Sequence, residues 1–143
     1  MNKAYFAYGA NLDPVSMKTR CPDATPRGRA VLRGHRFFIT LDGYASVRAE
    51  AGRQVNGLLW YLPALDETAL DQFEGVPDGL YQKDHRLVIH ESGNQVAAMI
   101  YVARAVHAGR ARPGYLEGIL AAASSLGFPP DYLDELRRSE LPS

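Results

Sequence analysis

The sequence has one cysteine, no excess of either charge and no long apolar run. Because Cys21 has no second cysteine to pair with, neither an intrachain disulfide nor a zinc site of paired cysteines can form. Sixteen Lys and Arg balance sixteen Asp and Glu without any run of one sign, which argues against a nucleic-acid-binding or membrane-surface role. No stretch approaches the roughly 20 apolar residues of a membrane-spanning helix.

Common catalytic and cofactor motifs are also missing. The sequence contains no G-x-S-x-G elbow of a serine hydrolase, no phosphate-binding loop ending in G-K-[ST], no dinucleotide fingerprint and no H-E-x-x-H zinc helix. The four histidines lie far apart without the spacing of metal ligands, so we expect no metal site. The first residues, MNKAYFAY, lack the apolar core and cleavage site of a secretory signal, and we expect a cytoplasmic protein.

The length of the chain and the absence of any linker favour one domain, residues 1–143, with its own hydrophobic core. Strands come mainly first and helices last, which favours an α+β fold with a mostly antiparallel sheet, curled or closed into a small β-barrel and flanked by short helices. The expected strands are 4–8, 28–42 (one long bent strand or two short ones), 55–62 and the hairpin 80–90 and 95–104; the expected helices are 13–20, 66–74, 113–126 and 131–140.

The segment YFAYGANL, Tyr5–Leu12, is the first candidate site. Its apolar strand ends at Gly9, where we expect a turn that a side chain would forbid, and Asn11 tolerates left-handed geometry. Asp13 followed by Pro14 predicts the start of a helix. The loop would then present backbone N–H groups near a positive helix end, which favours a carboxylate, a phosphate or a developing oxyanion. An ordinary strand-to-helix connection is the alternative.

Glu74 is the second candidate. The apolar stripe of Ala69, Leu70 and Phe73 predicts a helix that ends at Gly75, which puts Glu74 in the last turn. The C-terminal end of a helix is partly negative and disfavours a nearby anion by roughly 0.3 to 1 kcal/mol, so we expect a raised pKa for the Glu74 carboxyl. The alternative is a solvated glutamate that pairs with Arg or Lys.

Both segments resemble signature motifs of the γ-glutamylcyclotransferase family, also described as AIG2-like. YFAYGANL is similar to [YF]-x-[YF]-G-[ST]-N-[LM], and LDQFEGVPDGLYQK is similar to L-D-x-x-E-G-x-x-x-G-x-Y. The stretches GYASVRAEAGRQVNGLLWYL and MIYVAR also align with strands of the family. The resemblance covers essentially the whole chain, and the two motifs in this order are far more specific than either one alone.

The resemblance implies an intramolecular acyl transfer, in which the α-amine of a γ-glutamyl compound attacks its own side-chain carbonyl and yields 5-oxoproline and a free amine. It implies that Glu74 is the general acid and base, that the substrate is a small γ-glutamyl amino acid, peptide or amine, and that neither a metal nor an organic cofactor takes part. It also implies a substrate-binding set of backbone N–H groups and aromatic side chains: Tyr8, Gly9, Ala10, Asn11, Leu12, Tyr81, Tyr101 and Tyr115.

Ala10 departs from the family pattern, which has serine or threonine at this position. Because the loop relies mainly on backbone N–H groups, we expect altered affinity or substrate choice rather than loss of activity. Two other functions stay open: a non-catalytic protein that binds a small carboxylate ligand on the same fold, and a hydrolase in which Glu74 activates water. The oligomeric state is open as well, although the resemblance makes a homodimer possible, because relatives are often dimers. We expect no nucleic-acid or membrane partner.

Overall fold

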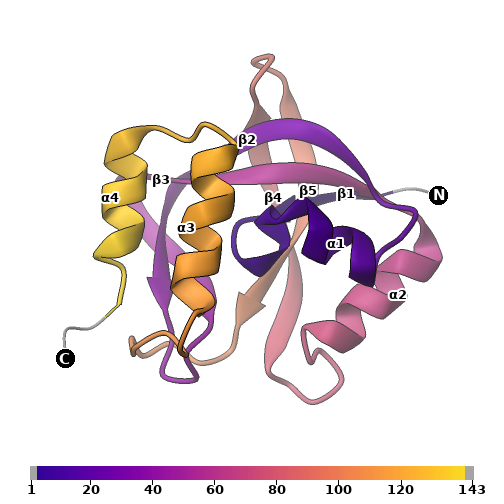
Figure 1. Ribbon diagram of the computed structural model, residues 1–143. Helices are drawn as coiled ribbons and strands as arrows, with labels where there is room; N and C mark the ends of the chain where they lie inside the picture. The colour runs from indigo at the N-terminus through magenta and orange to yellow at the C-terminus, as the bar shows by residue number, and fades with distance from the viewer. Residues whose placement is uncertain (1–2, 141–143) are drawn as a thin grey trace.

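The computed structural model describes residues 3–140, which form a closed five-stranded β-barrel with short helices around it (Figure 1). Around the barrel the strands follow the order β1-β3-β2-β4-β5, and all neighbours are antiparallel except β5 and β1, which run parallel where the barrel closes. The expected α+β class is confirmed, with a barrel rather than an open curled sheet. The strands are β1 (Lys3–Ala7), β2 (Thr25–Ile39), β3 (Ala45–Leu62), β4 (Tyr81–His90) and β5 (Gln95–Ala103).

Strand β2 has the predicted length but begins and ends three residues earlier, whereas β3 is longer than predicted and begins at Ala45 rather than at residue 55. Residues 45–49 pair with residues 35–39 of β2, and the pairing register shifts between Arg33 and His35. This shift marks a bulge, which bends a strand and increases its twist, so one continuous ribbon can wrap around the barrel. The choice between one bent strand and two short ones at 28–42 is therefore settled in favour of one bent strand.

The barrel interior is filled by large apolar side chains. Trp60 and Phe6 are fully buried, and each such side chain contributes about 1.5–3 kcal/mol by leaving water. Gly57 allows β1 and β3 to approach closely here, since a Cβ atom at this position would lie 2.5 Å from the Ala7 carbonyl oxygen and 2.5 Å from the Phe6 ring.

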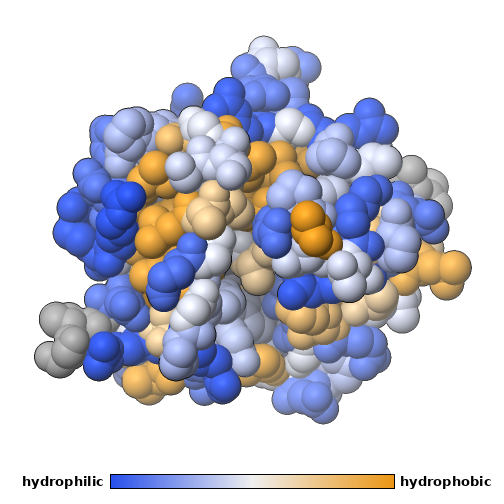
Figure 2. Space-filling model, viewed as in Figure 1, coloured by the Kyte–Doolittle hydropathy of each residue, from blue (hydrophilic) through white to orange (hydrophobic). Residues whose placement is uncertain are grey.

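Helices lie on two sides of the barrel in Figure 1, α1 and α2 on one side and α3 and α4 on the other. In Figure 2 apolar residues gather over α3 and its contact with α4, with hydrophilic residues around them. The prediction of a single domain over residues 1–143 stays a prediction, because the terminal residues lie outside the described range. The helices in residues 3–140 are α1 (Pro14–Arg20), α2 (Ala64–Phe73), α3 (Tyr115–Ser125) and α4 (Pro130–Arg137), with a 3₁₀ turn, η1 (Ala10–Leu12), before α1.

All four predicted helices are present, with bounds that differ by one to three residues at their ends. Helix α2 begins at Ala64 rather than at Asp66, and the Asp66 carboxylate accepts a hydrogen bond of 3.0 Å from the Asp23 backbone N–H. Asp66 therefore ties α2 to the loop after α1 instead of capping the helix. Within residues 3–140 no helix is long and apolar enough to span a membrane.

Candidate active site

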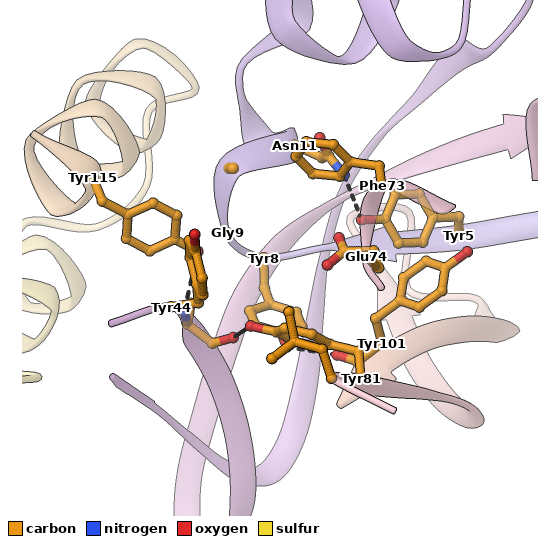
Figure 3. A pocket seen from close by; sticks show the side chains of 13 residues that line it. Tyr5, Tyr8, Gly9, Asn11, Tyr44, Phe73, Glu74, Tyr81, Tyr101 and Tyr115 are labelled. Atoms are coloured by element: carbon orange, nitrogen blue, oxygen red, sulfur yellow. Dashed lines mark hydrogen bonds between the residues drawn. The ribbon is translucent and has the colours of Figure 1, made fainter. Parts of the chain in front are cut away.

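A cavity of about 180 Å³ lies where the ends of β1 and α2 meet the starts of β4 and α3 (Figure 3). Most of its wall is aromatic or apolar, and Glu74 is the one charged side chain among the described lining residues. Segments remote in sequence therefore enclose a single carboxylate. The lining residues are Tyr5, Tyr8, Gly9, Ala10, Asn11, Tyr44, Ala45, Phe73, Glu74, Leu80, Tyr81, Tyr101 and Tyr115.

Glu74 follows the last residue of α2 and points its carboxylate into this cavity (Figure 3). It forms the C-cap rather than part of the last turn, and its N–H donates to the Leu70 carbonyl oxygen at 2.9 Å. Burial raises the pKa of the Glu74 carboxyl from 4.5 to about 7, while the nearby Arg20 guanidinium acts in the opposite direction. The expected direction of the pKa shift is confirmed, with loss of hydration as its main cause.

The loop after β1 is a single 3₁₀ turn. Leu12 donates its N–H to the Gly9 carbonyl oxygen at 3.0 Å, and Asp13 donates its N–H to the Ala10 carbonyl oxygen at 3.3 Å. The N–H groups at the start of such a turn have no partner inside it, which leaves those of Ala10 and Asn11 for a ligand. The prediction for Leu12 was wrong, since its N–H is occupied and its fully buried side chain does not line the cavity.

The backbone at this loop also differs from the prediction. No residue other than glycine has a positive φ within residues 3–140, so Asn11 is not left-handed. A Cβ atom at Gly9 would lie 3.4 Å from both the Ala45 Cβ and the Tyr115 hydroxyl, in van der Waals contact with both. The absence of a side chain at Gly9 keeps this wall of the cavity open.

Helix α1 begins as predicted but contributes no cavity wall. The Asp13 carboxylate accepts hydrogen bonds from the Val15 N–H at 3.3 Å and from the Ser16 hydroxyl at 2.8 Å, and Pro14 is the first helical residue. The cavity lining stops at Asn11. Any anion in the cavity would therefore meet the N–H groups of η1 rather than the end of α1.

Four predicted tyrosines line the cavity, and their hydroxyl groups have different partners. Tyr8 donates to the Tyr101 carbonyl oxygen at 2.6 Å, and Tyr81 donates to the Ala45 carbonyl oxygen. Tyr115 instead accepts a hydrogen bond of 3.0 Å from the Ala45 N–H, so its own hydrogen is free for a ligand. Burial raises the pKa of Tyr115 to about 12, which keeps this hydroxyl protonated near neutral pH.

Tyr101 presents only its ring to the cavity. Its hydroxyl donates a hydrogen bond of 2.6 Å to the Asp71 carboxylate, which also lies 2.9 Å from Lys83 Nζ. Burial and then the Asp71 charge raise the pKa of Tyr101 far above its usual value. Tyr101 therefore lines the cavity as predicted, but with its ring, because its hydroxyl hydrogen is held by Asp71.

The sequence reasoning missed several lining residues. Tyr5 stands one position before the first motif, and Phe73 and Leu80 stand at variable positions of the second motif, so the motifs did not select them. Tyr44 and Ala45 lie in the segment 43–53, which aligns with strands of the family but has no strand pattern of its own and was not assigned to the site. Pairing of this segment with β2 carries both residues to the cavity, and no local pattern indicates that pairing.

Metal-binding and thiol chemistry find no support at this site. Residues 3–140 contain no group of three His, Cys, Asp or Glu side chains placed to hold a metal ion. Cys21 is fully buried and does not line the cavity, and burial raises the pKa of its thiol to about 11. Glu74 is therefore the one lining side chain whose pKa suits proton transfer near neutral pH.

Comparisons with known proteins agree with the motifs. The model of the AIG2-like family matches residues 54–136, more than half of the chain. The gamma-glutamylcyclotransferases of Homo sapiens and Mus musculus are each 25% identical to it, over 95% of this chain and 78% of their own length. A solved structure named gamma-glutamyl cyclotransferase shares the fold, with a TM-score of 0.91 and 24% identity over 100% of this chain and 90% of its own. The solved structure of an uncharacterized human protein is also similar, with a TM-score of 0.87 and 25% identity over 99% of this chain and 90% of its own. The chain therefore belongs to the AIG2-like, γ-glutamylcyclotransferase family.

Proposed function

We propose that this protein converts a γ-glutamyl amino acid, peptide or amine into 5-oxoproline and a free amine. The observation that carries the proposal is the position of Glu74, a carboxyl with a pKa of about 7 that shares a largely apolar cavity with the N–H groups of η1. The names of the curated relatives support the same reaction.

The proposed reaction needs one proton carrier and one site for negative charge. The Glu74 carboxylate takes a proton from the substrate's α-ammonium, and the amine nitrogen then forms a bond to the side-chain carbonyl carbon. The carbonyl oxygen becomes an oxyanion, and in this proposal the N–H groups of Ala10 and Asn11 stabilise it. Protonated Glu74 returns its proton to the departing nitrogen as the old C–N bond breaks. The ring nitrogen still carries one proton more than the lactam of 5-oxoproline, and the regenerated Glu74 carboxylate accepts this second proton and passes it to the free amine, which leaves as an ammonium.

The chemistry suits a site with few catalytic groups. Closing a five-membered ring within one molecule already has a large orientational advantage, so the enzyme mainly folds the substrate and moves a proton. A carboxyl with a pKa of about 7 is populated in both protonation states near neutral pH, as a group that first accepts and then donates must be. The Tyr115 hydroxyl, whose hydrogen is free, supplies a donor for a substrate carboxylate.

A panel of γ-glutamyl amino acids, peptides and amines tests the proposal. Incubation with the purified protein is expected to release 5-oxoproline from at least one of them, identified by its mass, and Glu74→Gln is expected to abolish release. Leu65→Gln is a matched control, because Leu65 is 86% exposed on the same helix and does not line the cavity. Formation of glutamate instead of 5-oxoproline would indicate hydrolysis and contradict the cyclisation.

A non-catalytic binding protein is the second candidate, and Ala10 is the observation that favours it. A serine or threonine hydroxyl, which the family pattern has here, is missing from the cavity wall. Tight binding of γ-glutamyl compounds without release of any product, measured by calorimetry and mass analysis of the same samples, would establish this alternative. Restoring the hydroxyl with Ala10→Ser and thereby gaining turnover would identify Ala10 as the cause.

A further inference from the structure

Three side chains from three different elements form a hydrogen-bonded row beside Glu74. Arg20 Nη1 of α1 lies 2.5 Å from Asn11 Oδ1, and Asn11 Nδ2 lies 3.0 Å from the Tyr5 hydroxyl oxygen of β1. Asn11 and Tyr5 are 2% and 4% exposed, so the bond between them is shielded from water. The Arg20 guanidinium also lies 3.7 Å from the centroid of the Phe73 ring, which ties the row to the residue before Glu74.

Elementary hydrogen-bond chemistry sets the direction of every bond in this row. A guanidinium carries only donors, so the atom of Asn11 that faces Arg20 must be the carbonyl oxygen. The amide nitrogen of Asn11 therefore faces Tyr5, and because this nitrogen only donates, the Tyr5 oxygen must accept. The single hydrogen of the Tyr5 hydroxyl is thus excluded from the side of Asn11.

The other side of the Tyr5 hydroxyl faces the cavity that Glu74 enters. Figure 3 shows the Tyr5 hydroxyl bonded to Asn11 and the Glu74 carboxylate among the side chains that line this cavity. Burial raises the pKa of Tyr5 well above its usual value, and the Glu74 charge is the next largest cause, so the two groups interact across poorly hydrated space. A carboxylate is the strongest acceptor on this side of the hydroxyl.

We infer that Arg20, Asn11 and Tyr5 are positioning residues that direct the hydroxyl hydrogen of Tyr5 at the Glu74 carboxylate. The inference rests on the proposed function for the role of Glu74 as proton carrier. Tyr5 keeps its proton throughout the reaction. Its hydrogen bond favours the carboxylate form, so it orients Glu74 as a base and makes protonated Glu74 a stronger acid toward the departing amine.

Substitutions at Asn11 separate a directing role from a merely structural one. In Asn11→Asp, one carboxylate oxygen keeps Arg20 and the other accepts the Tyr5 hydrogen, which turns that hydrogen away from Glu74. In Asn11→Leu the row is broken, but leucine has no acceptor and Arg20 cannot accept either. The Tyr5 hydrogen therefore still points at Glu74 in the leucine variant, although the hydroxyl is held less firmly.

Steady-state release of 5-oxoproline by Tyr5→Phe, Asn11→Asp, Asn11→Leu and the double variant Tyr5→Phe/Asn11→Asp tests the inference. Tyr5→Phe and Asn11→Asp are expected to lower kcat by about ten- to a hundredfold with little change in KM, and to move the rising limb of the pH–kcat profile to higher pH. Asn11→Leu is also expected to lower kcat, because the hydroxyl of Tyr5 is held less firmly, but to leave that limb in place. In the double variant, Asn11→Asp should add no further loss, because the hydrogen it redirects is already absent.

An unchanged kcat in Tyr5→Phe, or the same shift of the pH–kcat limb in Asn11→Leu and Asn11→Asp, would overturn the inference. Neutron diffraction from deuterated wild-type crystals gives an answer that depends neither on activity nor on the folding of any variant. A deuterium on the Tyr5 oxygen that points to Glu74 supports the inference, and one that points to Asn11 refutes it. A wild type that releases no 5-oxoproline would refute the proposed function alone, since the neutron map would still decide the direction of the hydrogen.

Discussion

The Asp71 carboxylate holds the hydroxyl of Tyr101 at 2.6 Å and turns it away from the cavity that the Tyr101 ring lines. The same carboxylate lies 2.9 Å from Lys83 Nζ, and Lys83 also pairs with Glu67. This cluster connects α2 to the β4–β5 hairpin just before the chain reaches Glu74. Its role is therefore to fix the helix that ends at the candidate acid, and the Tyr101 hydroxyl belongs to that framework.

Tyr101→Phe is accordingly expected to affect stability more than activity. The variant keeps the ring and loses one hydrogen bond to a charged group, so the free energy of unfolding should fall by about 1.5–3 kcal/mol, while kcat/KM stays within about threefold of wild type. Urea unfolding and the 5-oxoproline assay measure the two quantities. Tyr101→Ala is the contrasting variant, because it removes the ring and should lower both the free energy of unfolding and kcat/KM. A large loss of activity in Tyr101→Phe would show that the hydroxyl contacts the substrate.

Glu74→Gln is expected to stabilise the fold at alkaline pH while it removes activity. The folded protein binds the Glu74 proton with a pKa of about 7 and the unfolded chain with a pKa near 4.5, so wild-type stability from this group is complete below 4.5 and is lost as the pH rises through 7. The loss is on the order of 3 kcal/mol, and glutamine does not titrate. The unfolding midpoints of wild type and Glu74→Gln should therefore be close at pH 4.5, and at pH 8 the variant should be the more stable protein. A wild type that is more stable than the variant at pH 8 would contradict the buried position of this carboxyl.

Two glycine substitutions should change stability in opposite directions. Gly57→Ala places a Cβ atom 2.5 Å from the Ala7 carbonyl oxygen, so β1 and β3 must separate, and we expect the free energy of unfolding to fall by about 3 kcal/mol. Gly118→Ala adds a Cβ atom in the middle of α3 with no atom within 4 Å outside the helix backbone, and should raise stability by about 0.5–1 kcal/mol. Thermal unfolding of the two variants tests the barrel packing without reference to activity. Equal effects of both substitutions would contradict the close approach at Gly57.

Cys21 is expected to be inert in the folded protein. Its side chain is fully buried, and burial raises the pKa of the thiol to about 11, so almost no thiolate exists at pH 8. A disulfide reagent at pH 8 should label the unfolded protein at once and the folded protein only at the rate at which it opens. Rapid labelling of the native state would show that the loop after α1 is open to solvent.

The sequence predicts those features of the site that depend on local chemistry. Glu74 follows from a helical stripe that ends at a glycine, and the loop after β1 follows from Gly9 and the Asp13–Pro14 helix start. The hairpin of β4 and β5 follows from alternation and a turn around Gly93, which has a φ of 95°. These signals lie within one or two elements and need no knowledge of the tertiary structure.

Features that depend on long-range pairing could not be predicted in this way. Closure of the barrel joins β1 to β5 at Tyr5 and Met99, and no local pattern specifies that contact. The direction of a tyrosine hydroxyl depends on the neighbours that folding provides, so the sequence places Tyr101 at the cavity but does not show that its hydroxyl bonds Asp71. Leu12 was assigned as a donor because the motif includes it, whereas the hydrogen bond inside the 3₁₀ turn occupies its N–H.

The pH dependence of kcat/KM for release of 5-oxoproline tests the role of Glu74 most directly. Because the carboxylate form accepts the substrate's proton, kcat/KM is expected to rise with pH through an apparent pKa of about 7, and Glu74→Gln should remove nearly all of the rate across the whole range. A rate that shows no ionisation near pH 7, or a Glu74→Gln variant that retains full activity, would contradict the assignment of Glu74 as the proton carrier.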